Sequence, residues 1–273
     1  MKIGVPKEIK QQENRIGLTP ESVKILTSNG HQVLFENNGG FEAGFYNKQY
    51  KEAGAKIIEK AEDIFNEADI IVKVKEPLSN EVKMIRENQI IFTYLHLAAA
   101  KELTKGLIKS KAVCIAYETV TDDNGKLPLL APMSAVAGRM SIQAGAHSLE
   151  KNQKGRGLLL GGAPGVDPAN VVILGGGVVG ENAALIATGM RAKVHIVDKS
   201  EKRLEQLKDI FGDKIIPQLS DKTDLKKLVS ECDLLIGGVL IPGAEAPKLI
   251  TKEMIKTMKR GSVVVDVAID QGG

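Results

Sequence analysis

His96 closes a mostly apolar segment, IIFTYLH, whose composition predicts a buried strand. An imidazole titrates near neutral pH, so a histidine at the end of such a strand could act as a general acid or base. A histidine beside an apolar run is also commonly a structural side chain whose hydrogen bonds are satisfied inside the protein. The segment alone leaves both interpretations open.

Two other basic residues follow predicted strands of the same half of the chain. Arg15 lies in GVPKEIKQQENRIGLTP after the first strand, and Lys75 ends the strand in DIIVKVKEP. An arginine can clamp a carboxylate through two parallel hydrogen bonds. Ligands bind at the carboxyl ends of parallel strands, so Arg15, Lys75 and His96 could form one substrate site. Ordinary surface charge is the alternative for Arg15 and Lys75.

Short β-branched runs alternate with helical patterns along the first half, which predicts a parallel α/β sheet. We predict strands at Lys2–Val5, Gln32–Glu36, Ile70–Val74, Ile90–Tyr94 and Ala112–Ala116. We predict helices at Pro20–Asn29, Asn47–Ala53, Ala61–Glu67, Glu81–Glu87 and Ala100–Ser110. Thr19 and Pro20 favour the start of the first helix, and Gly30 favours its end.

A turn-rich segment, Asp122–Pro132, predicts a boundary between domains 1–130 and 131–273. A linking helix rich in small residues follows at about 133–151, and its composition favours close packing at an interface between domains or subunits. The second half alternates again, with strands expected at Val171–Leu174, Lys193–Val197, Lys214–Pro217, Leu234–Val239 and Ser262–Val267. The expected fold class is α/β, with two Rossmann-like domains of mainly parallel sheets.

The second domain carries a dinucleotide-binding pattern. Gly175, Gly177 and Gly180 fit G-x-G-x-x-G between a short strand and a helix that starts near Val179, and Asp198 ends the next strand. The glycines allow a tight turn and a close backbone approach to a pyrophosphate, and the carboxylate can accept hydrogen bonds from ribose hydroxyls. The cofactor contacts predicted here are Gly175, Gly177, Val178, Val179, Gly180 and Asp198. A glycine turn without a ligand is the alternative.

The carboxylate of Asp198 favours NAD over NADP because it would repel a 2′-phosphate, although Lys199, Lys202 and Arg203 lie close in sequence. The ends of the last two strands should line the nicotinamide side. These are Val239, Leu240 and the stretch Val267–Asp270, where Asp270 is expected just past a buried strand. Asp270 could also be a helix cap or a solvated loop residue.

Composition limits the function classes. The chain has no Trp, its aromatic content is 4% and its net charge is +3, which argues against a nucleic-acid partner. The N-terminus lacks the apolar core of a secretory signal and no apolar run would span a membrane, so we expect a cytoplasmic protein without a membrane partner. Cys114 and Cys232 lie in apolar segments and are expected to be reduced. No metal site is expected.

The sequence resembles the alanine dehydrogenase family, within the group shared with the transhydrogenase α subunit. The matching words are GVPKEIKQQENRIGLTP, VKVKEP, TYLHLA, LLAPMSAVAGRMSIQAGAHSLEK, GVDPANVVILGGGVVGENAA and DVAIDQGG. The resemblance implies reversible oxidative deamination of L-alanine to pyruvate and ammonium with NAD, in a homo-oligomer that is commonly a hexamer. It also implies His96 and Asp270 as catalytic residues and Arg15 and Lys75 as the substrate-binding pair. The NAD contacts that it implies are Ser134, Asp198, Arg203, Ser220, Val239, Leu240, Val267, Ala268, Ile269 and Asp270.

Three features depart from the family pattern. Gln12 stands where Asn is usual, and Arg191 where a Gly commonly follows the helix. A left-handed Arg191 would cost about 1 kcal/mol relative to Gly. The family normally continues past the position of Gly273 by about a third of this length, with a last strand and helices that complete the substrate domain.

Two alternatives to an alanine dehydrogenase remain. They are a transhydrogenase-type NAD-binding subunit and a truncated NAD-binding remnant without turnover. TYLHLAA and Lys75 argue against the transhydrogenase type.

Overall fold

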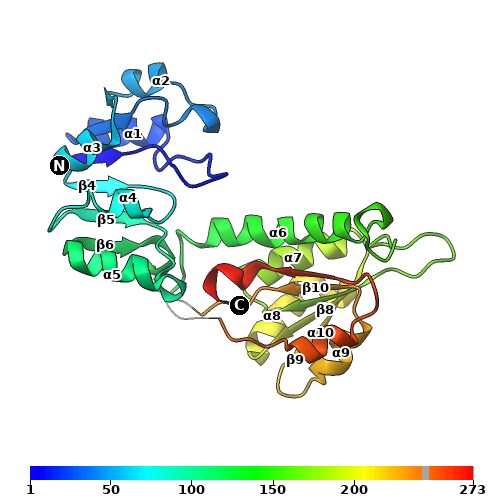
Figure 1. Ribbon diagram of the computed structural model, residues 1–273. Coiled ribbons are helices and arrows are strands. Elements are labelled where there is room, and N and C mark those ends of the chain that lie inside the picture. Colours follow the sequence, from blue (N-terminus) through cyan, green and yellow to red (C-terminus); the bar gives the residue numbers. More distant parts are fainter. Residues whose placement is uncertain (242–245, 273) are drawn as a thin grey trace. The chain divides into compact units, whose positions relative to one another are not determined.

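The computed structural model describes residues 1–241 and 246–272, with the backbone alone at 270 and 271. The chain divides into two compact units, Met1–Leu127 and Pro128–Gly273. Each unit contains one parallel sheet with helices packed on both of its faces (Figure 1). The expected fold class, two Rossmann-like α/β sheets, is therefore confirmed.

The sheet of the first unit has the strand order β3-β2-β1-β4-β5-β6, and all neighbouring strands are parallel. Its strands are β1 (Lys2–Val5), β2 (Gln32–Glu36), β3 (Lys56–Ile58), β4 (Ile70–Val72), β5 (Ile90–Thr93) and β6 (Val113–Ala116). Its helices are α1 (Pro20–Ser28), α2 (Asn47–Glu52), α3 (Ala61–Glu67), α4 (Ser79–Val82) and α5 (Lys101–Ser110). Three short 3₁₀ helices are η1 (Phe41–Ala43), η2 (Leu97–Ala99) and η3 (Tyr117–Thr119).

Two apolar clusters bury the faces of this sheet. Ile3 and Val5 of β1 pack with Val23 of α1 and Tyr50 of α2 on one face. On the other face, buried residues of β4 and β5 pack with Ile64 and Phe65 of α3 and with Leu107 of α5. The helix start predicted at Thr19 is confirmed, because Thr19 Oγ1 accepts the N–H of Ser22 at 3.3 Å.

One predicted helix is wrong and one strand was missed. The helix expected at Glu81–Glu87 is observed as the single turn α4, Ser79–Val82. The chain after it is held by tertiary contacts instead, since the Arg86 side chain donates to the carbonyl oxygens of Phe65 at 3.1 Å and Ala68 at 2.6 Å at the end of α3. The edge strand β3 has three residues, too few to show a pattern.

The sheet of the second unit has the order β11-β10-β7-β8-β9 and is also parallel. Its strands are β7 (Asn170–Leu174), β8 (Lys193–Asp198), β9 (Ile215–Leu219), β10 (Leu234–Gly237) and β11 (Val263–Asp266). Its helices are α6 (Ala131–Ser148), α7 (Val178–Gly189), α8 (Glu201–Phe211), α9 (Leu225–Glu231) and α10 (Lys252–Thr257). The 3₁₀ helices are η4 (Lys151–Gln153), η5 (Gly212–Lys214) and η6 (Val267–Gln271).

Small residues bring the long helix α6 close to its neighbours within the second unit, where it runs along α7 (Figure 1). A Cβ at Gly138 would lie 2.2 Å from the carbonyl oxygen of Val179 on α7, and one at Gly145 would lie 2.6 Å from the Leu234 side chain on β10. Any larger residue at these two positions would push α6 away from α7 and the sheet.

Two other expectations concern the backbone of Arg191 and the burial of the strand before Asp270. Arg191 has a φ of 63°, so the left-handed conformation considered for this position is confirmed. The expectation of a buried strand before Asp270 is wrong. The last described strand, β11, lies at the edge of the sheet, and the side chain of Val264 is 45% exposed. An edge strand is covered on fewer sides than a central strand, which accounts for this exposure.

Candidate functional site

The three basic residues singled out in the first half lie at one edge of its sheet. Arg15 follows β1, Lys75 follows β4 and His96 follows β5, and these three strands are neighbours. Because the strands are parallel, their carboxyl ends meet at the same edge. The strand order also reverses between β1 and β4, and such a switch point is where α/β sheets bind ligands.

The backbone of Lys75 is fixed from two sides. Glu8, which follows β1, accepts the N–H groups of Val74 at 2.6 Å and Lys75 at 3.3 Å. Thr93 at the end of β5 donates its hydroxyl to the carbonyl oxygen of Lys75 at 3.0 Å. Among the described residues, the Lys75 ammonium makes no hydrogen bond or ion pair. Its peptide is therefore held in place while its charge is available to a ligand.

A buried ion-pair triad stabilises the position of Glu8. The ammonium of Lys73, whose side chain is 1% exposed, lies 3.1 Å from Glu8 and 2.7 Å from Glu81. Glu81 also accepts the N–H of Leu78 at 2.8 Å at the start of α4. Removing one partner of such a buried pair typically costs about 3–5 kcal/mol, so the triad locks β1, β4 and α4 together beneath Lys75.

Arg15 is held by a carboxylate two residues before it. The Glu13 side chain accepts from Arg15 Nε at 2.8 Å and from Arg15 Nη2 at 2.6 Å. This hydrogen bonding holds the pKa of Glu13 below its ordinary value, against the opposing effect of burial. A guanidinium has five N–H groups, so Arg15 keeps donors for a ligand carboxylate while Glu13 fixes its orientation.

His96 has a left-handed backbone, with φ 50° and ψ 39°. Few residues other than glycine adopt this conformation without support from their surroundings. The support comes from Glu118 in η3, a buried residue that accepts the N–H of His96 at 2.6 Å and the N–H of Leu95 at 3.1 Å. Glu118 therefore fixes the turn that presents His96 at the sheet edge.

The His96 ring faces a second carboxylate. Glu76 Oε2 lies 3.6 Å from His96 Nδ1, and Glu76 Oε1 forms an ion pair with Lys10. Burial would raise the pKa of Glu76, but its interactions with His96 and Lys10 outweigh burial and hold the pKa at about 2. Glu76 is therefore an anion at neutral pH, placed to interact with the ring of His96.

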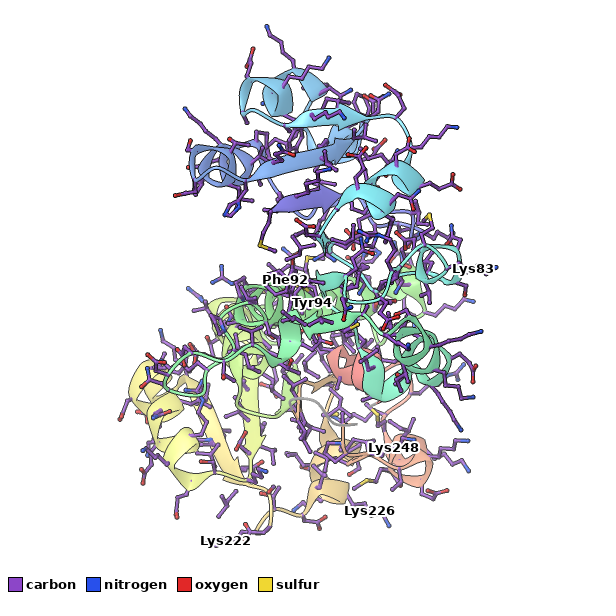
Figure 2. All side chains as sticks on the ribbon, turned by 90° about the vertical axis from the view of Figure 1, so that its left-hand side faces the viewer. Lys83, Phe92, Tyr94, Lys222, Lys226 and Lys248 are labelled. Carbon is purple, nitrogen blue, oxygen red and sulfur yellow. The ribbon has the colours of Figure 1, made fainter. Side chains whose placement is uncertain are left out.

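Aromatic rings pack beside this histidine. Tyr94 stacks against the His96 ring at a centroid distance of 6.1 Å, and Tyr117 contacts both Tyr94 and Phe92 edge-to-face at 5.0 Å and 4.4 Å. Phe92 and Tyr94 are labelled among the side chains in Figure 2. Burial raises the pKa of Tyr94 above its ordinary value, so its phenol remains protonated. The rings form a mainly apolar wall on one side of His96.

These contacts define what the first unit can do chemically. Arg15 and Lys75 can bind an anion that carries a second polar oxygen, and His96 can exchange a proton with it. Four carboxylates that hold this set were not predicted from the sequence. They are Glu8, Glu13, Glu76 and Glu118. Each follows a strand of the sheet, a signal that is visible in PKEIK, QENR, KVKEP and YETV.

In the second unit, the glycine motif forms the turn that a dinucleotide requires. Gly175 has a φ of 94°, and a Cβ at Gly180 would lie 1.8 Å from the Gly175 carbonyl oxygen. A Cβ at Gly177 would meet no atom within 4 Å, so the space beside Gly177 is open. Helix α7 begins at Val178 and its N-cap has no side-chain hydrogen bond. These features fit a pyrophosphate bound by the first-turn amides.

Asp198 and Arg203 hold the middle of this turn. Asp198 accepts the N–H groups of Gly176 at 2.6 Å and Ser200 at 2.8 Å. Arg203 Nε donates to the carbonyl oxygen of Gly176 at 2.6 Å, and the same guanidinium pairs with Glu181 of α7. Each Asp198 oxygen retains a lone pair for a ribose hydroxyl. Arg203 is largely occupied by contacts within the protein.

The remaining predicted cofactor contacts lie at the same strand ends, with one exception. Ser220 follows β9 and donates its backbone N–H to the carbonyl oxygen of Asp198 at 2.9 Å. Val239 and Leu240 follow β10, and Val267, Ala268 and Ile269 lie in η6 after β11. The exception is Ser134, which lies in the first turn of α6, one turn before Gly138 at the contact with α7. The predicted role of Asp270 depends on a side chain outside the described residues.

In the described part of the chain, no three His, Cys, Asp or Glu side chains are grouped so that they could hold a metal ion. No helix within residues 1–241 or 246–272 is both long and apolar enough to cross a membrane.

Comparison with known proteins covers both units. Residues 4–137 match the family model of the alanine dehydrogenase/PNT N-terminal domain, and residues 141–273 match that of the C-terminal domain. An alanine dehydrogenase of Methanococcus maripaludis is 54% identical over 273 residues, which is all of this chain and 73% of the relative. One of Halomonas elongata is also 54% identical, over 74% of its length.

Solved structures give a consistent result. A structure described as L-alanine dehydrogenase superposes with a TM-score of 0.89 at 50% identity, over 99% of this chain and 75% of the other. A transhydrogenase from Sinorhizobium meliloti gives a TM-score of 0.80 at 26% identity, over 100% of this chain and 80% of that one. The chain is thus more similar to the alanine dehydrogenases than to this transhydrogenase.

Proposed function

The chain belongs to the alanine dehydrogenase/PNT family, and we propose that it catalyses the NAD-dependent, reversible oxidative deamination of L-alanine to pyruvate and ammonium. The observation that carries this proposal is the placement of Arg15, Lys75 and His96 at the carboxyl ends of three adjacent parallel strands. A short 2-oxo acid carries a carboxylate next to a carbonyl, which suits two fixed cations and one proton donor.

Each residue has a proposed role. Arg15, oriented by Glu13, holds the substrate carboxylate. Lys75, whose peptide is fixed by Glu8 and Thr93, binds the carbonyl oxygen and favours negative charge on it. His96 donates and removes the protons that imine formation and hydrolysis require. The side chain of Asp270 is proposed, from the family resemblance alone, as a second catalytic group.

The cofactor is proposed to bind the second unit. When bound, NAD supplies the acceptor for the hydride that leaves the Cα of L-alanine. The amides at the start of α7 would bind its pyrophosphate beside Gly177, and Asp198 would accept from the adenosine ribose. The other proposed contacts are Ser134, Gly175, Val178, Val179, Gly180, Arg203, Ser220, Val239, Leu240 and Val267–Asp270.

The protein is also proposed to be a cytoplasmic homo-oligomer, which the family resemblance suggests is a hexamer. The transhydrogenase alternative has weaker support, because the similarity to the solved transhydrogenase is 26% against 50% for the solved L-alanine dehydrogenase.

The proposal is tested by following NADH absorbance with the purified protein, NAD⁺ and L-alanine, and then in reverse with pyruvate and ammonium. We expect turnover in both directions with L-alanine and none with D-alanine. Lys75→Gln should lose most turnover, whereas Lys83→Gln, a change on the same unit, should leave it unchanged. Absence of L-alanine-dependent turnover from a folded protein that binds NADH would contradict the proposal.

A further inference from the structure

One oxygen of Glu76 lacks a hydrogen bond. Glu76 Oε2 is a buried atom without a hydrogen-bond partner among the described residues, whereas Oε1 pairs with Lys10. The His96 Nδ1 atom lies 3.6 Å from this oxygen, just beyond hydrogen-bond distance. The two side chains are largely enclosed, with 13% of His96 and 18% of Glu76 exposed.

A buried carboxylate oxygen without a donor is unfavourable, because the charged group has lost its hydrogen bonds to water and gained none in the protein. A neutral imidazole carries one proton, on either Nδ1 or Nε2, and a hydrogen bond to one nitrogen decides which. An N–H at Nδ1 would satisfy Glu76 Oε2 after a small rotation of the ring. A lone pair at Nδ1 would instead face the anion and repel it.

We propose that Glu76 is a positioning residue that keeps neutral His96 in its Nδ1–H form, so that Nε2 is the nitrogen that exchanges protons with the substrate. The inference deepens the proposed function and rests on it for the role of Nε2. The tautomer of His96 is a property of the protein alone, so this part of the inference does not depend on the proposed function.

The other groups around His96 have different tasks. Glu118 accepts the backbone N–H of His96 and fixes the turn, so it does not select the tautomer. Tyr94 contacts the ring by stacking. Lys10 binds the other oxygen of Glu76 and orients that carboxylate. Glu118 thus binds the backbone of His96, and Glu76 interacts with its ring.

Lys10 determines how the side-chain amide should be oriented in the Glu76→Gln variant. An ammonium only donates hydrogen bonds, so in Glu76→Gln the amide oxygen should face Lys10 and the amide NH₂ should face His96 Nδ1. That arrangement favours a lone pair on Nδ1 and moves the proton to Nε2. In the double variant Lys10→Met/Glu76→Gln the amide is free to turn its oxygen to Nδ1. The double variant should therefore recover part of the Nδ1–H form, and Lys10→Met alone should resemble the wild type.

The tautomer is read directly from imidazole ¹⁵N chemical shifts at a pH where the ring is neutral. The chain has four histidines, and His96→Gln identifies the resonances of His96. We expect mainly Nδ1–H in the wild type, mainly Nε2–H in Glu76→Gln and partial return in the double variant. A wild-type ring in the Nε2–H form, or a tautomer that Glu76→Gln leaves unchanged, would overturn the proposal.

Kinetics give a second readout. Loss of the partner that orients a metal-bound histidine typically costs about 10–100-fold in activity, and we expect an effect of the same size for the partner of a reacting histidine. Glu76→Gln should lower kcat by that factor with the KM for pyruvate changed by less than about threefold, since Arg15 and Lys75 are intact. Glu102→Gln, an exposed change on α5, is the matched control and should have no effect. A larger effect on KM than on kcat would contradict the positioning role. If the wild type shows no turnover, the proposed function fails while the ¹⁵N experiment still decides the tautomer.

Discussion

The Glu118 carboxylate accepts the backbone N–H of His96 at 2.6 Å and so supports a left-handed histidine at the end of β5. Glu118 is buried and also accepts from Leu95. Glu118→Ala would leave two amide donors without partners, each worth about 1–3 kcal/mol when buried. We therefore expect a loss of about 2–6 kcal/mol in the free energy of unfolding and a large fall in kcat.

Urea unfolding measures the first effect and initial rates measure the second. Glu42→Ala, a change at an exposed glutamate of the same unit, is the control and should change neither. A Glu118→Ala protein with wild-type stability would show that the turn does not depend on this carboxylate.

Two of the glycines in the dinucleotide-binding motif should respond differently to an added methyl group. Gly180→Ala places a Cβ 1.8 Å from the Gly175 carbonyl oxygen, so the unfolding temperature should fall. Gly177→Ala meets no protein atom within 4 Å, so the fold should persist while NADH binding weakens. Thermal unfolding and calorimetric titration with NADH separate the two cases. Unchanged NADH affinity in Gly177→Ala would mean that the pyrophosphate does not approach this residue.

NADH should bind more tightly than NADPH. Asp198 at the end of β8 would repel a 2′-phosphate, and the nearest arginine, Arg203, is engaged by Gly176 and Glu181. Calorimetric titration of both cofactors measures the preference. Equal or tighter binding of NADPH would show that Lys199 or Lys202 compensates for the carboxylate.

The folded-state pKa of Glu76 is about 2, below the value of 4.5 for a free glutamate. A depressed carboxylate pKa stabilises the folded state above the unfolded pKa, and this stabilisation is lost as the pH falls towards the folded value. The difference in stability between the wild type and Glu76→Gln should therefore shrink as the pH falls from about 4.5 to about 2. Urea unfolding of both proteins across this range measures it, and a difference independent of pH would contradict the ion contacts of Glu76.

Local signals in the sequence were sufficient to find the nucleotide loop, the basic residues of the first unit and every described strand except β3. Arg15, Lys75 and His96 each follow a β-branched run, and strand ends of a parallel sheet meet at one edge. Glu8 and Glu118 were missed because their contacts join distant segments, Glu8 with Val74 and Glu118 with His96. Glu13 is different, because it binds Arg15 only two residues away. The helix predicted at Glu81–Glu87 is wrong for a related reason, because the Arg86 side chain binds the end of α3, a segment distant in sequence.

His96 is the proposed acid and base of the alanine dehydrogenase reaction. Steady-state rates of His96→Ala with L-alanine and NAD⁺, measured beside its NADH affinity, test this role. Loss of a general acid–base group typically lowers the rate by about 10²–10⁴-fold. We predict a loss in that range with NADH affinity nearly unchanged, because His96 and the glycine loop lie in different units. Turnover within a few-fold of the wild type would contradict the acid–base role of His96 and indicate that this residue is structural.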